Sequence, residues 1–76
     1  MKRLYRITNI TTRRVADEIE KYASEINGLR SINISPGLKL AVIDADERDF
    51  DRVVHEIDLI LSDVSPVSDI EFEKEL

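Results

Sequence analysis

The spacing of the apolar residues changes four times along the chain, and this restricts the fold more than any other feature. Strands place every second residue on one face, whereas helices repeat every 3.6 residues. Tyr5 and Ile7 alternate, and the apolar residues between 15 and 26 then follow the helical spacing. The same sequence of patterns recurs in the second half of the chain. The expected elements are strands at 3–8, 29–34, 38–44 and 67–72, and helices at 15–26 and 50–61.

Capping and turn residues separate these elements. Thr11 or Thr12 can cap the first helix, and Asn27-Gly28 can end it. Ser35-Pro36-Gly37 reads as a turn between the second and third strands, so these two strands form a hairpin. Ser65-Pro66 ends the second helix.

The order β-α-β-β-α-β predicts an α+β ferredoxin-like fold, with both helices on one face of a four-stranded antiparallel sheet. We assign residues 1–72 to this domain and residues 73–76 to a tail or the start of a linker. On the third strand, Leu40 and Val42 share one face with Leu38, and Ala41 and Ile43 share the other. We expect Leu4, Ala41 and Ile43 on the open face, opposite the helices.

Size and composition exclude several classes of protein. The chain has 76 residues, which is typical of one domain, and it contains no cysteine. Disulfides, thiolate metal sites and cysteine nucleophiles are therefore excluded. No apolar run approaches the length of a membrane span. These features predict a cytoplasmic location, for the chain alone or as the soluble part of a membrane transporter, with no direct membrane contact.

The charge is unevenly distributed. The net charge is −5, yet residues 1–14 contain five basic residues and no acidic one. The acidic remainder argues against a nucleic-acid or anionic-membrane partner. The basic end predicts an acidic partner.

Residues 9–20, which read NITTRRVADEIE, resemble the signature of heavy-metal-associated domains, Gly-Met-Thr-Cys-x-x-Cys-Ala-x-x-Ile-Glu. Ile10 stands at the position of the family's buried methionine. The segments 28–34 and 39–42 are similar to the family's second and third strands, so the resemblance extends over residues 3 to 72. The residues that match the signature in register are Thr11, Ala16, Ile19 and Glu20.

The resemblance implies a role in heavy-metal transport. The family occurs as metallochaperones and as N-terminal modules of copper, zinc and cadmium P-type ATPases. Its two metal-binding cysteines fall on Thr12 and Val15. A threonine hydroxyl is a poor ligand for a soft metal and valine offers none, while Arg13 and Arg14 add positive charge. We therefore expect no metal or other cofactor in this loop.

In this family the loop also docks partner chaperones or other domains of the pump. Cations in the first turn of a helix oppose the helix dipole, which marks Arg13 and Arg14 as candidate functional residues. With Arg6 and Lys2 they form the predicted docking set, whose partner is an acidic protein surface or another domain of a metal pump. The leading interpretation is a non-catalytic regulatory or docking module of a heavy-metal-transporting P-type ATPase.

Two alternatives come from other classes of protein. The first is a free-standing interaction module that forms a homodimer through the open face of its sheet. The second is an acylphosphatase-like enzyme, in which Arg13 or Arg14 binds phosphate with help from Asn33. The glycine-rich loop that such an enzyme requires is missing from residues 9–12.

Overall fold

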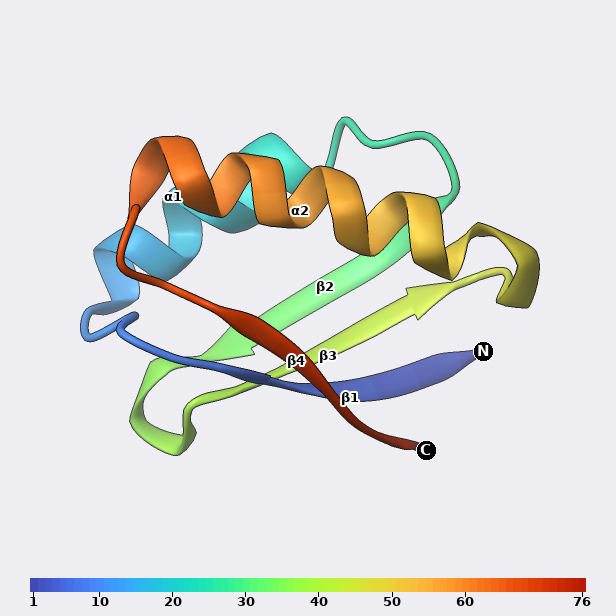
Figure 1. The fold of residues 1–76 in the computed structure, drawn as a ribbon, viewed down its shortest axis with the longest axis horizontal. Coiled ribbons are helices and arrows are strands. Elements are labelled where there is room, and N and C mark those ends of the chain that lie inside the picture. Colours follow the sequence, from blue (N-terminus) through green and yellow to red (C-terminus); the bar gives the residue numbers. More distant parts are fainter.

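The computed structural model describes residues 1–76 and confirms the predicted architecture. A four-stranded antiparallel sheet, in the order β2-β3-β1-β4, carries both helices on one face (Figure 1). Neither helix has the length and apolar character needed to cross a membrane. The elements are β1 (Lys2–Ile7), α1 (Arg13–Ala23), β2 (Leu29–Ser35), β3 (Leu40–Ala45), α2 (Phe50–Val64) and β4 (Ile70–Glu75), with 3-10 turns at Pro36–Leu38 and Glu47–Asp49.

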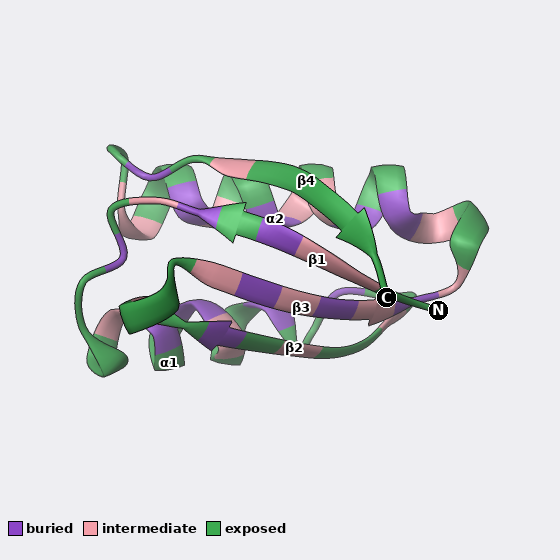
Figure 2. Cartoon of the chain, turned by 90° about the horizontal axis from the view of Figure 1, so that it is seen from below, coloured by how far each residue is buried: buried purple, intermediate pink, exposed green.

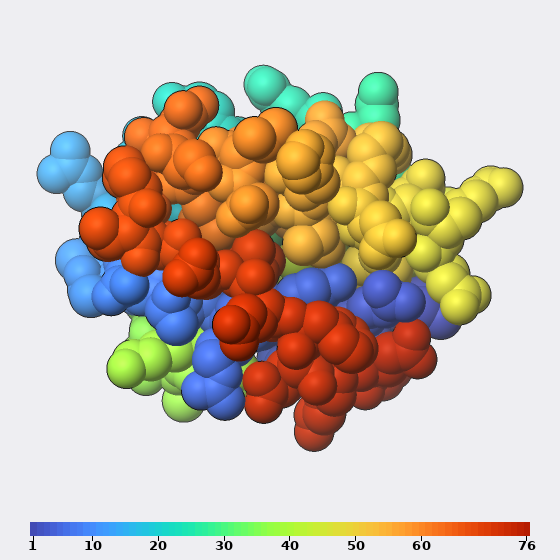
Figure 3. Space-filling view, in the orientation of Figure 1, coloured from blue at the N-terminus to red at the C-terminus, as the bar shows by residue number.

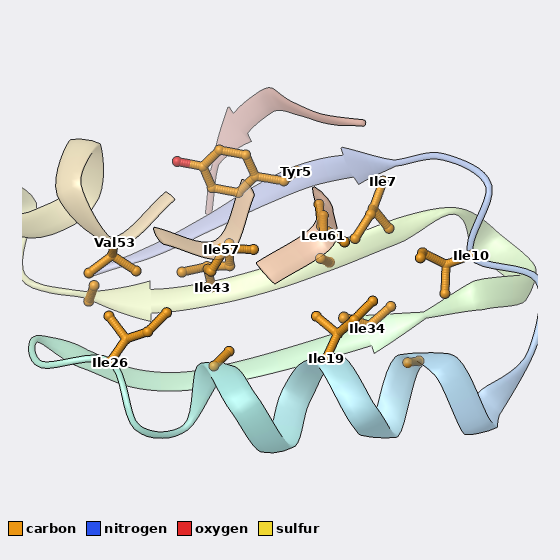
Figure 4. Packing of buried hydrophobic residues seen from close by; sticks show 14 of the residues in the cluster. Tyr5, Ile7, Ile10, Ile19, Ile26, Ile34, Ile43, Val53, Ile57 and Leu61 are labelled. Carbon is orange, nitrogen blue, oxygen red and sulfur yellow. The ribbon is translucent and has the colours of Figure 1, made fainter. Parts of the chain in front are cut away.

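The core lies between the sheet and the two helices (Figure 4). Helix α1 supplies small and branched residues such as Ala16 and Ile19, which allow it to lie close to the sheet. Helix α2 contributes a longer apolar face that includes Phe50 and Ile57. Ile26 is also buried, although α1 ends before it, at Ala23.

The prediction of which residues lie on the open face of the sheet is wrong for two of the three residues. Ala41 and Ile43 are fully buried beneath the helices. Alternation divides a strand into two faces, but only its pairing decides which face meets the helices. Tyr5, a core residue of β1, lies opposite Ala41, and this register turns Ala41 and Ile43 inward. The half-buried apolar residues of the open face are Leu4, Leu40 and Val42.

The last strand also differs from the expectation of 67–72. Residues 65–69 form a turn in which the Ser68 amide donates to the Ser65 carbonyl at 2.9 Å. Strand β4 therefore begins at Ile70 and runs to Glu75, so residues 73–75, expected as a tail, belong to the sheet. They pair with β1, and a bulge at Glu73 shifts the register between Leu4 and Tyr5.

Three connections meet at one end of the molecule (Figure 2). They are residues 8–12 after β1, residues 36–39 after β2 and residues 65–69 after α2. The Ile7 amide donates to the Lys39 carbonyl and the Thr8 amide to the Asp69 carbonyl, each at 3.0 Å. The loop that carries the predicted site is therefore held between two other connections, while the chain termini lie at the opposite end (Figure 2).

Candidate functional site

The loop between β1 and α1 is held in place at two residues. Asn9 adopts a left-handed backbone conformation, with φ of 61°, which asparagine tolerates better than most residues. Its side-chain amide donates to the Val67 carbonyl at 2.7 Å. Ile10 is 3% exposed and belongs to the core. It thus occupies the buried position at which the resemblance places a methionine.

Thr12 is the N-cap of α1. Its Oγ1 accepts a hydrogen bond from the Val15 amide at 3.3 Å, and its carbonyl accepts from the Ala16 amide. The Val15 side chain packs, half-buried, against the core. The two positions at which the resemblance implies metal-binding cysteines are therefore used to begin and to anchor the helix.

Arg13 is bound to its own fold. Its guanidinium pairs with Asp17 at 2.8 Å and with Glu20 at 2.9 Å, and it donates to the Ile34 carbonyl at 2.6 Å. Glu20 in turn accepts a hydrogen bond from the Ile34 amide at 2.7 Å. The hydrogen bond to Glu20 is the main cause that raises the pKa of Arg13 above its usual value. The Arg13 side chain therefore links α1 to the outer edge of β2.

Arg14, in contrast, is exposed and forms no ion pair. Exposed apolar side chains lie on the neighbouring connections, where Leu38 is 71% and Val67 is 70% exposed. Lys39 is exposed and also has no ionic partner. The third connection contributes an exposed acidic residue, Asp69, to the same end of the molecule. We define the loop-end surface as five of the exposed side chains at this end: Thr11, Arg14, Leu38, Lys39 and Val67.

The four residues predicted for docking do not form one surface. Lys2 lies at the far end of β1, about 17 Å from the loop at the usual rise of a strand. Arg6 pairs with Glu73 of β4 at 3.4 Å. Of the predicted set, only Arg14 has an unpaired charge at the loop end. The sequence pattern does not indicate Leu38, Lys39 and Val67, because these residues come from turns, and the spacing of turns does not predict which loops lie together.

The loop end has no pocket and no cluster of metal-ligating side chains. No group of three or more histidine, cysteine, aspartate or glutamate side chains lies close enough to hold a metal ion. The hollows of the surface lie between the helices, at residues 46–48 and between β4 and α2. The loop end is thus suited to contact with another surface more than to enclosing a small ligand.

Arg13 and Asn33, one of the two residue pairs of the acylphosphatase-like alternative, are not brought together. Asn33 lies between Ile32 and Ile34, which turn toward the helices, so that its side chain is on the open face of the sheet. Arg13 lies on the helix side and is committed to Asp17 and Glu20. The two side chains are therefore separated by the sheet.

Comparisons with known proteins find no family model and no curated protein that matches this chain. Solved structures do match over nearly the whole chain. A copper-binding domain from the P-type ATPase HMA7 aligns with a TM-score of 0.76 and 17% identity, covering 97% of this chain and 95% of that one. The fold is that of the heavy-metal-associated domains.

Two further structures have the same architecture. The yeast copper transporter domain Ccc2a, solved in apo and Cu(I)-loaded states, aligns with a TM-score of 0.75 and 14% identity over 99% of this chain and 97% of that one. The N-terminal domain of a potential copper-translocating P-type ATPase from Bacillus subtilis, in the Cu(I)-loaded state, aligns with a TM-score of 0.77 and 16% identity over 99% of this chain and 89% of that one. At these identities the likeness is one of fold, and the side chains of the loop decide what the site can do.

Proposed function

We propose that this chain is a degenerate heavy-metal-associated domain, which acts as a regulatory or docking module in heavy-metal transport. The observation that carries the proposal is the fold match over almost the full length of copper-transporter domains, in a chain without cysteine. The parent protein that fits best is a heavy-metal P-type ATPase, with this domain on its cytoplasmic side.

The chemistry of the loop supports the loss of metal binding. Soft metals such as Cu(I) are held by thiolate or thioether sulfur. The Thr12 hydroxyl is used as a helix cap, and Val15 packs on the core. The charge of Arg14 is unpaired beside these positions and opposes a bound cation.

The same surface supports docking of a protein. Arginine is enriched where proteins meet, the buried centre of an interface is more apolar than the rest of the surface, and charged rims guide the encounter. Leu38 and Val67 provide the exposed apolar part of the loop-end surface, and Arg14 and Lys39 provide free positive charge. The partner that fits is an acidic protein surface with an apolar patch, such as another domain of the pump.

A metal titration tests the first part of the proposal. We expect the natural chain to show no stoichiometric Cu(I) or Zn binding tighter than about 1 µM. The double variant Thr12→Cys with Val15→Cys places thiolates at both positions of the same fold. We expect it to bind one Cu(I) more tightly than about 1 µM. The control is Thr12→Ser with Val15→Ser, which alters the same positions without adding sulfur.

The outcomes separate the two parts of the claim. Tight Cu(I) binding by the natural chain contradicts the lost site. Failure of a folded double-cysteine variant to bind Cu(I) contradicts the derivation of this loop from a metal-binding one. The full-length gene tests the proposed parent protein. Membrane spans and a phosphorylation domain encoded beyond Leu76 would support a P-type ATPase.

A further inference from the structure

The two outer edges of the sheet differ in whether side chains block their backbone groups. On β2, Glu20 and Arg13 occupy both backbone groups of Ile34, as described above, so a strand added there has to displace an ion pair. On β4, residues 71–75 are all exposed, and the strand pairs only with β1. No side chain forms a hydrogen bond with the β4 backbone. The β4 edge is therefore open for pairing, a feature that proteins commonly block.

The register identifies the backbone groups that are free. The Thr8 amide is directed toward β4. Because successive residues of a strand direct their backbone groups to opposite sides, Arg6, two residues before Thr8, also faces β4. Glu71 pairs with Arg6 and consequently faces β1. Ile70 and Phe72, on either side of Glu71, direct their amides and carbonyls outward.

A hollow of about 410 Å³ runs beside this edge, between β4 and α2. In Figure 3, atoms of β1 (blue) are visible between α2 (yellow to orange) and β4 (red). Val54, Ile70 and Phe72 make its apolar part, and Arg3, Tyr5 and Asp51 complete the lining.

Phe72 is 55% exposed, yet two neighbouring side chains hold its ring in place. Its ring meets the Tyr5 ring edge-on, with centroids 5.7 Å apart. The guanidinium of Arg3 lies 5.6 Å from the Phe72 centroid and 4.2 Å from that of Phe50. An apolar side chain placed in the hollow thus meets a preformed aromatic wall.

The charge of this region determines what kind of segment fits. Glu71 and Asp51 form no ion pair, and neither does the exposed Lys74 near the end of β4. Glu73 and Glu75 are paired with Arg6 and Arg3. Glu71 lies on the open face of the sheet, opposite to the face that carries Phe72. Each copy of β4 carries three glutamates and one lysine, so pairing β4 with its own copy brings together two strands of net negative charge, and a second copy of the chain is disfavoured.

We propose that the β4 edge accepts an extended segment of a partner protein as a fifth strand, with alternating apolar and basic side chains. The apolar side chains enter the hollow beside Phe72, and the basic side chains face Glu71. Backbone hydrogen bonds to Ile70 and Phe72 provide the pairing, as in other cases of strand addition. This surface lies on the side of the sheet and is distinct from the loop-end surface.

A peptide titration followed by NMR tests the proposal. The probe is a short synthetic peptide of alternating valine and lysine, added to the isotope-labelled chain at low salt. We expect shift changes in β4, the facing side of α2 and the adjacent part of β1, together with slower hydrogen exchange of the Phe72 amide. A peptide N-methylated at alternate amides, and one with glutamate in place of lysine, are expected to bind at least tenfold more weakly.

A charge variant gives an independent measurement. Glu71→Lys reverses the unpaired charge beside the edge and is expected to weaken binding about fivefold at low salt. Glu25→Lys is the matched control, because Glu25 is also exposed and unpaired but lies at the end of α1, and it is expected to leave binding unchanged. The proposal is overturned by shift changes confined to β2 or the loop end, by equal binding of the N-methylated peptide, or by no binding at millimolar peptide.

Discussion

Two adjacent arginines at the start of α1 have the same charge and different environments. Arg13 pairs with two carboxylates and the backbone of β2, and these contacts offset its unfavourable position near the positive end of the helix dipole. Arg14 has no such contact and remains available to a partner. The residue expected to matter for docking is therefore Arg14, and the residue expected to matter for stability is Arg13.

Alanine variants test this division. We expect Glu20→Ala to lower the free energy of unfolding by about 1–2 kcal/mol, because the half-buried Ile34 amide loses its acceptor. Arg13→Ala is expected to lower this free energy by less than Glu20→Ala does, since the Arg13 side chain is 52% exposed and its ion pairs are screened by solvent. Arg14→Ala serves as the control and should change stability by less than about 0.5 kcal/mol. Urea unfolding measures all three, and an equal cost for both arginines contradicts the assignment.

At the scale of the elements, β4 is the segment whose extent changes the interpretation of the molecule. Its last residues pair with β1, and the Leu76 amide donates to the Lys2 carbonyl at 3.0 Å. Arg3–Glu75 and Arg6–Glu73 ion pairs accompany this pairing. Residues 73–76 therefore stabilise the domain and shape the edge that we propose for strand addition.

Deletion of residues 73–76 tests this role. We expect the free energy of unfolding to fall by about 2 kcal/mol, because the deletion removes several backbone hydrogen bonds that each contribute about 0.5–1.5 kcal/mol. Glu73→Gln with Glu75→Gln keeps the strand while removing its ion pairs, and should cost less than about 1 kcal/mol. A deletion variant as stable as the full chain, in thermal or urea unfolding, argues that these residues are a tail.

For the whole molecule, the distribution of exposed apolar residues bears on self-association. Leu38 and Val67 lie at the loop end, Phe72 on β4, and Tyr22 and Leu59 on the helices. The open face of the sheet offers only the half-buried Leu4, Leu40 and Val42. No single face gathers a large apolar patch of the kind that stable dimers use.

Sedimentation measures the consequence for the oligomeric state. We expect a monomer at tens of micromolar, because the burial of Ala41 and Ile43 removes two of the three residues expected at a sheet-to-sheet interface. A dimer that Val42→Lys dissociates would support the homodimer interpretation. Arg14→Ala is the control, since it alters an exposed residue far from the open face.

The order of the elements and the absence of thiolate ligands follow from the amino-acid sequence alone. Periodicity and turn residues are local properties, and folding cannot supply a thiolate ligand to a chain without cysteine. The buried face of β3, the extent of β4 and the different environments of Arg13 and Arg14 depended on the tertiary structure. Each rests on a contact between distant segments, such as the bond from Arg13 to Ile34, 21 residues away. Such contacts exist only once the strands have paired and the helices have packed against them.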